Sequence, residues 1–360
     1  MEGTAQRILG TILPFAVVLV TMPMLTRIAP ALGFVDHPGG RKAHAAATPL
    51  VGGIAIYLAV LVAMAAAGPI EPMGHWLAAL TMLLAVGLLD DTREVSPRAK
   101  FVVEILACAV MIAWGGMRLT SVGDLIGWRP IGLNYLVMPL TVFAVIGVVN
   151  AVNMIDGMDG LAGSVSFVAF AWYAAVAIES GLALQAVICL AFCGALAGFL
   201  PFNLRLPWRG RAAAFLGDAG SLMIGFALGC LAIDLTQGAN RSFPPICALW
   251  VVLLPLADCV SIMSRRLNSG RSPFVPDREH IHHYLLARGF SPQAALATLV
   301  AISALFGAVG YFGWRLKVSE PYLFWPFFFI YFGYHYWIKS AWKRVHSRGV
   351  EAGTAVARKS

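Results

Sequence analysis

The sequence predicts an all-α integral membrane protein with about eleven transmembrane helices. Three observations support this fold class. Of the 360 residues, 59% are hydrophobic and only 12% are charged, whereas soluble domains carry about 25% charged residues. The apolar residues come in long blocks, and short polar stretches separate these blocks. A run of roughly 20 mainly apolar residues is long enough to cross a bilayer as a helix.

Each apolar block is interpreted as one helix. The first block is too long for a cleavable signal peptide, and no small-residue cleavage site follows it, so it is predicted to be a retained span. Several later blocks are short, and a re-entrant or interfacial segment is the alternative for each of them. In chain order the predicted helices cover residues 8–28, 50–67, 76–89, 101–114, 136–149, 161–178, 182–200, 215–233, 244–263, 294–314 and 321–338.

The chain has no low-complexity tract and no convincing internal repeat. We therefore predict a single polytopic domain over residues 1–340 and a basic cytoplasmic tail over residues 341–360. The longest connection, about 264–292, contains proline, glycine and charged residues, which favours a substrate-binding loop. The six cysteines show no CxxC pair and no metal-binding spacing with histidine, so they are interpreted as packed apolar side chains.

Lys and Arg residues indicate the orientation. The loops after blocks one, three, five, seven and nine, together with the C-terminal tail, hold 20 of the 26 Lys and Arg residues. Because cytoplasmic loops are rich in Lys and Arg, this side is predicted to be cytoplasmic, with the N-terminus periplasmic and the C-terminus cytoplasmic. The net charge of +8 fits a face that meets anionic lipid and anionic substrate. Nucleic-acid binding is disfavoured, since the basic residues border membrane spans.

Five aspartates form three clusters at the ends of apolar blocks: Asp90 with Asp91, Asp156 with Asp159, and Asp218. All three clusters fall on the predicted cytoplasmic side, although the orientation used only Lys and Arg. Acids in so apolar a chain are costly unless they act together. Grouped carboxylates suit a divalent metal and a phosphate. The clusters therefore predict one shared site at the cytoplasmic face.

Asp90 and Asp91 end the third block. Adjacent helical residues point about 100° apart, so one carboxylate can face a metal while the other faces a substrate. Arg98 and Lys100 follow within a few residues and could pair with phosphate. The alternative is a charged helix end that marks the membrane boundary.

The run from Asn153 to Gly160 is more specific. Asp156 and Asp159 are three residues apart and would share a helix face, and the glycines beside them let the backbone approach a ligand closely. A calcium loop is disfavoured because the EF-hand spacing and its terminal Glu are missing. A structural turn is the other alternative.

Asp218 lies in the segment FLGDAGS, which follows Asn203 and a loop with three arginines. Taken alone, an aspartate there is typical of a helix N-cap. The turn TPLVGG before the second block suits either a plain loop or a ligand contact. Asp258, inside the ninth block, is equally compatible with function and with a structural hydrogen bond.

The densest polar run is PDREHIHH, residues 276–283. Three histidines and an arginine can hold a diphosphate by charge and hydrogen bonds. Zinc is the alternative, because His280 and His283 could chelate it. Zinc is disfavoured because no HExxH motif is present and the aspartates prefer a hard metal.

Together these motifs resemble the polyprenyl-phosphate N-acetylhexosamine-1-phosphate transferases, an integral membrane family within glycosyltransferase family 4. The resemblance covers nearly the whole chain, through HAAATPLVGGI, DDTREVSPRAKF, NAVNMIDGMDGLAG, FLGDAGS and PDREHIHHYLLARGFS. The segment SRRLNSGRSPFVPDREHIHH is similar to the branch that uses UDP-N-acetylglucosamine. The muramoyl-pentapeptide branch usually has an uninterrupted HHH run and a Lys where this chain has Ala47, so that substrate is disfavoured.

The resemblance implies roles for individual residues. Asp90 would orient or deprotonate the lipid phosphate, and Asp91 and Asp218 would hold Mg²⁺ or Mn²⁺. The other expected catalytic residues are Asp156 and Asp159. They would line the nucleotide-sugar pocket together with Asn153, and Asn203 and Phe215 would lie near the uracil. Lys100 would contact phosphate, and the diphosphate would bind Arg278, His280, His282 and His283.

The resemblance also implies the reaction. The phosphate of undecaprenyl phosphate would attack the β-phosphorus of UDP-N-acetylglucosamine in the bacterial inner membrane and expel UMP. This would be the first membrane step of O-antigen or a related cell-surface polysaccharide. The alternatives are another UDP-N-acetylhexosamine as donor, and a phospho-aspartate intermediate. A secondary transporter is disfavoured because most of the clustered acids lie at loops. A homodimer is left open.

Overall fold

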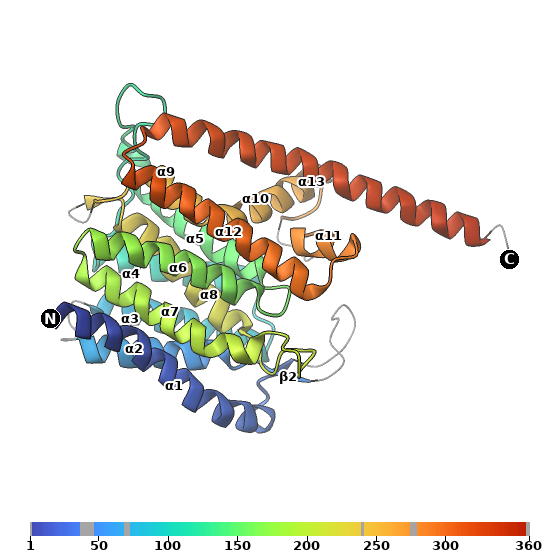
Figure 1. The fold of residues 1–360 in the computed structure, drawn as a ribbon, viewed down its shortest axis with the longest axis horizontal. Helices are drawn as coiled ribbons and strands as arrows, with labels where there is room; N and C mark the ends of the chain where they lie inside the picture. Colours follow the sequence, from blue (N-terminus) through green and yellow to red (C-terminus); the bar gives the residue numbers. More distant parts are fainter. Residues whose placement is uncertain (1, 37–46, 68–72, 239–240, 274–278, 358–360) are drawn as a thin grey trace.

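The computed structural model describes residues 2–36, 47–67, 73–238, 241–273 and 279–357. The chain forms a bundle of long helices that lie side by side (Figure 1). The first helices are α1 (Glu2–Leu32), α2 (Gly52–Ala67), α3 (Gly74–Thr92) and α4 (Pro97–Ala113). A short two-stranded antiparallel sheet, β1 (Val35–Asp36) and β2 (Thr48–Pro49), lies between α1 and α2.

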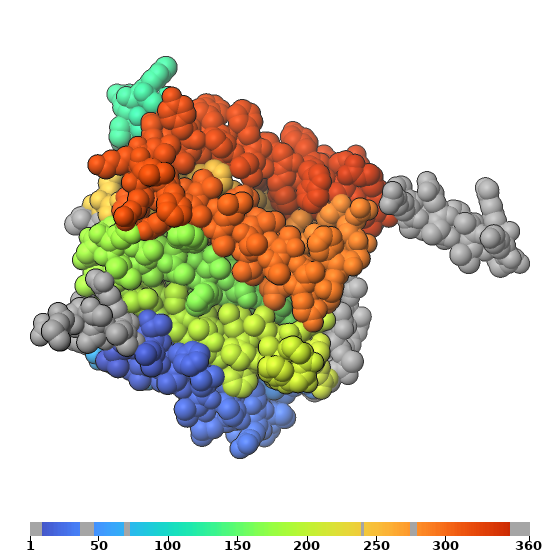
Figure 2. All heavy atoms as spheres, in the orientation of Figure 1, coloured from blue at the N-terminus to red at the C-terminus, as the bar shows by residue number. Residues whose placement is uncertain are grey.

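The second half of the bundle begins with the 3-10 turn η2 (Asn134–Leu136) and α5 (Val137–Ile155). It continues with α6 (Leu161–Glu179), α7 (Ala183–Asn203), α8 (Gly217–Asp234), α9 (Pro245–Val251) and α10 (Leu253–Asn268). The last helices are α11 (Ile281–Ala287), α12 (Pro292–Arg315) and α13 (Glu320–Ala357). Figure 2 shows α1 at one side of the molecule, α12 and α13 at the other, and α6 and α7 between them.

All eleven predicted blocks coincide with helices in the structure. In the described part of the chain, seven helices are long and apolar enough to cross a membrane, or eight if a bent pair counts as one span. α2 is apolar but shorter. The helices are consistent with an all-α membrane protein, apart from the small sheet, whereas the count of eleven spans and the orientation stay predictions. α13 continues through residue 340 without a break, so no helix end marks the predicted domain boundary.

The predicted ninth helix differs from the structure, because it divides into α9 and α10, which meet at a bend of 82°. Pro255 explains the break. Proline has no N–H to donate to the carbonyl four residues earlier, here that of Val251, so a continuous helix would lose a bond at this point. After the bend, α10 packs against α5, α12 and α13.

α8 forms the centre of the bundle. It packs against α2, α3, α5 and α6, and most of its residues are buried. Glycine makes two of these contacts close: a Cβ on Gly53 of α2 would lie 2.4 Å from the Gly220 nitrogen, and a Cβ on Gly87 of α3 would lie 2.3 Å from the Ala219 Cα. The first turn of α8, with Asp218, is therefore held between α2 and α3.

Candidate active site

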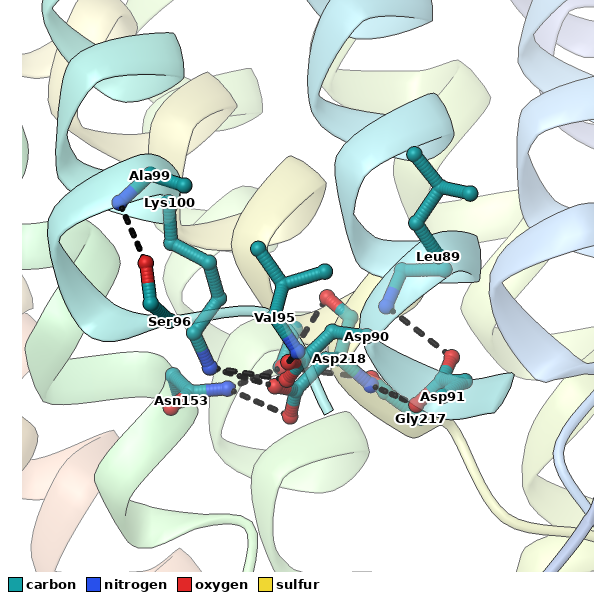
Figure 3. A network of polar contacts seen from close by, with 12 residues as sticks. Leu89, Asp90, Asp91, Val95, Ser96, Ala99, Lys100, Asn153, Gly217 and Asp218 are labelled. Atoms are coloured by element: carbon teal, nitrogen blue, oxygen red, sulfur yellow. Dashed lines mark hydrogen bonds and ion pairs between the residues drawn. The ribbon is translucent and has the colours of Figure 1, made fainter. Parts of the chain in front are cut away.

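The three acidic clusters lie at one end of the bundle, where α3 and α5 end and α6 and α8 begin. Lys100 in the first turn of α4 joins two of them. Its Nζ donates to Asp90 Oδ2 at 2.8 Å and to Asp218 Oδ2 at 3.0 Å. Asn153 near the end of α5 donates from Nδ2 to Asp218 Oδ1 at 3.0 Å and to Ser221 Oγ at 2.9 Å. Figure 3 shows these side chains converging on Asp218 from three helices.

The loop between α3 and α4 positions Lys100. Asp90 Oδ1 accepts from the Val95 backbone N–H at 2.6 Å, which folds the loop back onto the end of α3. Ser96 caps α4 by accepting from the Ala99 N–H, and Pro97 occupies the first helical position, where a missing N–H costs nothing. The sequence DDTREVSPRAK therefore turns the chain sharply and returns Lys100 to Asp90.

Asp91 points away from Lys100 toward the start of α8 (Figure 3). Its two carboxylate oxygens accept from the backbone N–H groups of Asp218 at 2.8 Å and Ala219 at 3.3 Å. Asp91 thus caps the helix that carries Asp218. Gly217 allows this contact, because its φ is +74° and a Cβ there would lie 2.5 Å from Asp91 Oδ2.

The TPLVGG turn holds the same segment through the backbone. Phe215 donates its N–H to the Pro49 carbonyl at 2.8 Å, and Gly52 donates its own to the Phe215 carbonyl at 3.0 Å. Gly53 bonds the Leu216 carbonyl in the same way at 3.0 Å. The turn therefore positions the segment before Asp218, which favours the structural interpretation of this motif.

Asp156 and Asp159 follow α5 and have different surroundings. Asp156 caps the end of α5. Its burial, followed by the negative charges of Asp218, Asp91 and Asp159, raises its pKa to about 7. Asp159 Oδ2 accepts from Arg205 Nε at 2.8 Å and from the Ala212 N–H at 3.2 Å. Asp159 therefore anchors the basic loop between α7 and α8, whereas Asp156 stays in a strongly negative part of the site.

Asn203 is buried and uses both ends of its amide. Its Oδ1 accepts from the Gly160 N–H at 2.9 Å, and its Nδ2 donates to the Ala214 carbonyl at 2.9 Å. Asn203 thus ties the Asp159 turn to the loop that leads to Asp218. Both amide groups are therefore used within the protein. Phe215, the other residue predicted near the uracil, is partly buried.

The described residues 279–283, called the histidine segment here, contact the acidic clusters at Gly157. A Cβ on Gly157 would lie 2.6 Å from His282 Nε2, so this turn needs glycine to accept the ring. The rings of His280, His282 and His283 pack together. The ring centroids are 5.5 Å apart for His280 and His282 and 4.2 Å apart for His282 and His283. Arg278 lies outside the described residues.

His282 is fully buried, and within the described part of the chain neither ring nitrogen has a hydrogen-bond partner. Burial, followed by the charges of His283 and His280, lowers its pKa to about 3. His282 is therefore neutral at pH 7 and can contact a phosphate only as a hydrogen-bond donor. Unpartnered buried polar atoms are costly, which favours a ligand beside Asp156 and Gly157.

A divalent metal suits the donor set on chemical grounds. Asp90 and Asp218 supply hard carboxylate oxygens, and burial, followed by the charges of the neighbouring carboxylates, raises the pKa of Asp156 beside them. In the described ranges, no group of three or more His, Cys, Asp or Glu residues could hold a metal by itself. Mg²⁺ commonly binds through one or two carboxylates plus substrate phosphates, so the arrangement fits a metal shared with a diphosphate.

Four residues that contact site residues were not singled out from the sequence: Ser221, Tyr334, Trp342 and Glu279. Ser221 bonds Asn153, Tyr334 bonds Asp258, and Trp342 bonds the Glu279 carbonyl. Tyr334 and Trp342 lie on α13, far from the motifs in sequence, and no local pattern marks them. Ser221 is part of FLGDAGS, three residues after Asp218, and the helical spacing could have identified it. Asp258 proves to be hydrogen-bonded to the histidine segment.

Comparisons with known proteins agree with this arrangement. The family described as glycosyl transferase family 4 matches residues 73–236, a range with all three acidic clusters. The chain is 35% identical to the undecaprenyl-phosphate alpha-N-acetylglucosaminyl 1-phosphate transferase of Escherichia coli K12 over 88% of this chain and 87% of the relative. The same-named protein of Haemophilus influenzae is 33% identical over 93% and 95%. That of Yersinia pestis is 36% identical over 88% and 87%.

Proposed function

The chain belongs to glycosyl transferase family 4, and we propose that it transfers N-acetylglucosamine 1-phosphate from UDP-N-acetylglucosamine to undecaprenyl phosphate, releasing UMP. The relatives named for this activity match most of the chain. One structural observation supports the proposal above the others. Lys100 bridges Asp90 and Asp218 at a bundle end to which Asp156 and the histidine segment also belong.

In the proposed reaction, an oxygen of the lipid phosphate forms a bond to the β-phosphorus of the donor. The bond from that phosphorus to the bridging oxygen breaks, and UMP leaves with the electron pair. A phosphate monoester has a second pKa near 6, so the acceptor is largely dianionic at neutral pH and needs no strong base. The protein must instead bring two anions together.

Different residues have different roles in bringing the two anions together. Lys100 supplies a fixed positive charge between Asp90 and Asp218, where a phosphate oxygen can approach it. The histidine segment supplies hydrogen-bond donors on the Gly157 side. Asn153 orients Asp218 through its amide. We propose that the acceptor phosphate lies on the Asp90 and Lys100 side and the donor diphosphate on the histidine side.

We propose Mg²⁺ or Mn²⁺ as the metal, held by Asp218 together with Asp90. When bound, it would neutralise charge on the donor diphosphate. Asp91 was expected to be a ligand. Both of its oxygens accept backbone amides at the start of α8, whereas Asp90 Oδ2 and both Asp218 oxygens bond the side chains of Lys100 and Asn153, which can shift to admit a metal. We therefore propose that Asp91 acts chiefly by fixing Asp218. The distribution of Lys and Arg supports a cytoplasmic site, and the family resemblance supports the bacterial inner membrane; both stay proposals.

Purified protein tests the proposal directly. With Mg²⁺, UDP-N-acetylglucosamine and undecaprenyl phosphate it should release UMP. Lys100→Met and Asp218→Asn should each lower turnover by about 100-fold or more. The matched control is Arg118→Met, an exposed cation that follows the opposite end of α4, and it should keep near-normal turnover. Absence of UMP release, when a relative of known activity turns over in the same assay, would contradict the proposal.

The donor sugar is tested separately. The family resemblance favours UDP-N-acetylglucosamine, and another UDP-N-acetylhexosamine is the alternative. A panel of UDP-sugars compared by kcat/KM for UMP release identifies the substrate, and the expected order has UDP-N-acetylglucosamine first. A higher kcat/KM for a different UDP-sugar would revise the substrate and leave the reaction class intact.

A further inference from the structure

Asp258 of α10 is a buried carboxylate outside the cluster that holds Lys100. Its side chain accepts three hydrogen bonds from two separate segments. Oδ2 bonds His280 Nδ1 at 2.8 Å, and Oδ1 accepts from the Ile281 N–H at 3.1 Å and from the Tyr334 hydroxyl at 2.6 Å. Burial of a carboxylate is costly unless it is paired and hydrogen-bonded, so these three partners explain how Asp258 can lie inside the protein.

The residues around this contact hold the start of the histidine segment from two sides. Arg265 lies two turns after Asp258 on α10 and donates from Nη1 to Glu279 Oε2 at 2.6 Å and from Nη2 to the Glu279 carbonyl at 2.9 Å. Trp342 of α13 donates from Nε1 to the same carbonyl at 2.8 Å. Residues 279–281 are therefore fixed by α10 and α13 together.

Hydrogen bonds also join α13 to α10 near Asp258. Ser261 lies one turn after Asp258, and its hydroxyl bonds His335 Nδ1 at 3.1 Å. The adjacent Tyr334 bonds Asp258 itself. Polar side chains of α10 therefore bind both α13 and the histidine segment. This explains why Asp258 lies inside an apolar block.

The contact with Asp258 fixes the His280 ring. An ionised carboxylate only accepts hydrogen bonds, so Nδ1 must be the donor. The opposite nitrogen, Nε2, is then the one available to a ligand. The ring planes of His280 and His282 are 17° apart, which keeps the two rings side by side.

We infer that Asp258 is a positioning residue for the transfer reaction, which fixes the tautomer and direction of His280 with the help of Tyr334. This inference rests on the proposed function, because His280 is assigned to the donor diphosphate. Asp258 itself does not reach the reacting atoms, since its oxygens are occupied by His280, Ile281 and Tyr334. Its effect on the reaction must therefore pass through His280.

Kinetics give the first test. Asp258→Asn keeps the size of the side chain but removes the charge that fixes Nδ1 as donor. We expect kcat/KM for the UDP-sugar to fall by about 10- to 100-fold, by analogy with residues that orient metal-binding histidines. The KM for undecaprenyl phosphate should change less than about twofold, because the acceptor is assigned to the Lys100 side. An equal loss for both substrates would contradict the assignment.

A double-mutant cycle tests whether Asp258 acts through His280. In the background of His280→Gln, adding Asp258→Asn should lower kcat/KM by no more than about twofold, since the group it positions is already gone. A purely structural role predicts the opposite, with the same loss in both backgrounds. Equal losses would overturn the inference.

The tautomer can be measured without any activity. Long-range nitrogen–proton spectra of protein labelled with ¹⁵N-histidine distinguish Nδ1–H from Nε2–H, and His280→Gln assigns the signals among the eight histidines. Wild type should show His280 protonated at Nδ1, and Asp258→Asn should change that state. An unchanged tautomer would overturn the inference even if the transferase is active. The expected change in an inactive protein would support the positioning contact and contradict only the proposed function.

Tyr334→Phe provides a milder variant if Asp258→Asn does not fold. It removes one of the three hydrogen bonds and leaves the carboxylate in place. We expect kcat/KM for the UDP-sugar to fall about three- to tenfold, the effect of one hydrogen bond, and the His280 signals to shift. Tyr311→Phe is the matched control, because that hydroxyl also bonds a carboxylate, Glu179, at the far end of α6. Equal effects of the two substitutions would contradict the inference.

Discussion

Asp90 and Asp91 are adjacent in the chain, but their side chains have separate partners. Asp90 bonds Lys100, ten residues later, whereas Asp91 bonds backbone amides 127 and 128 residues away. The angle between neighbouring helical residues predicts that the two carboxylates diverge. It cannot predict what each one meets, because the second contact depends on how α3 packs against α8.

The capping contact of Asp91 leads to a prediction about stability. Asp91→Ala leaves the amides of Asp218 and Ala219 without their acceptor, so we expect a loss of about 0.5–2 kcal/mol, as for a lost helix cap. Asp91→Asn keeps an amide oxygen as acceptor and should lose less. Thermal unfolding in detergent measures both. Turnover should fall with each variant, because the start of α8 carries Asp218.

Asp124→Ala is the matched control for Asp91→Ala. Asp124 also accepts from a backbone N–H, that of Gly127 at 2.9 Å, but in an exposed loop, so its loss should change stability by less than about 0.5 kcal/mol. If Asp91 is instead a metal ligand, the result differs. Asp91→Ala would then keep its unfolding temperature and require much more Mg²⁺ for turnover.

Asn203 and Asp159 show a second limit of residue-level prediction. The family resemblance assigns both residues to the nucleotide-sugar pocket. In the structure, Asn203 bridges two loops through its amide, and Asp159 bonds Arg205 and the Ala212 N–H. A motif identifies the residues that build a site, but it does not separate those that touch the ligand from those that hold the loops.

At the scale of elements, the position of α8 depends on small residues that face it. Gly87 of α3 is the clearest case, since a Cβ there would lie 2.3 Å from the Ala219 Cα, which belongs to the backbone. We expect Gly87→Ala to separate α3 from α8 and to cost about 1–3 kcal/mol, as for overpacking. The unfolding temperature and turnover should both fall, because Asp90 and Asp218 lie on these two helices.

Gly147→Ala is the matched control for the Gly87 substitution. Gly147 is also inside a helix, α5, but a Cβ there would meet no atom within 4 Å. The substitution should leave stability unchanged or raise it by about 0.5–1 kcal/mol, because alanine favours helices over glycine. Similar losses for both variants would show that close packing of α3 on α8 is not the reason that Gly87 is needed.

For the whole molecule, apolar blocks predict helices well because each block is bounded by polar residues. They predict long-range geometry poorly. The ninth block is mainly apolar and was predicted to be one helix, yet the chain bends by 82° between α9 and α10 near Pro255. After this bend, Asp258 of α10 contacts the histidine segment. The contribution of α13 was also not predicted, since Tyr334 and Trp342 meet residues that lie 76 and 63 positions away.

The orientation of the whole molecule can be tested with two tryptophans. Trp128 lies between α4 and α5 and is 87% exposed, and Trp208 lies between α7 and α8 and is 80% exposed. The helices that flank them place these loops at opposite ends of the bundle. The six native cysteines are all buried, so each tryptophan can be replaced by cysteine with little background.

The positive-inside rule assigns the Trp208 loop, with its three arginines, to the cytoplasm. A membrane-impermeant maleimide should therefore label Trp128→Cys on intact cells and label Trp208→Cys only after permeabilisation. The unsubstituted protein should stay unlabelled in both conditions, which is the control for the native cysteines. The reverse pattern would place the acidic clusters on the outer face, away from cytoplasmic nucleotide sugars. It would thereby contradict both the predicted orientation and the proposed access of the donor to Lys100 and Asp218.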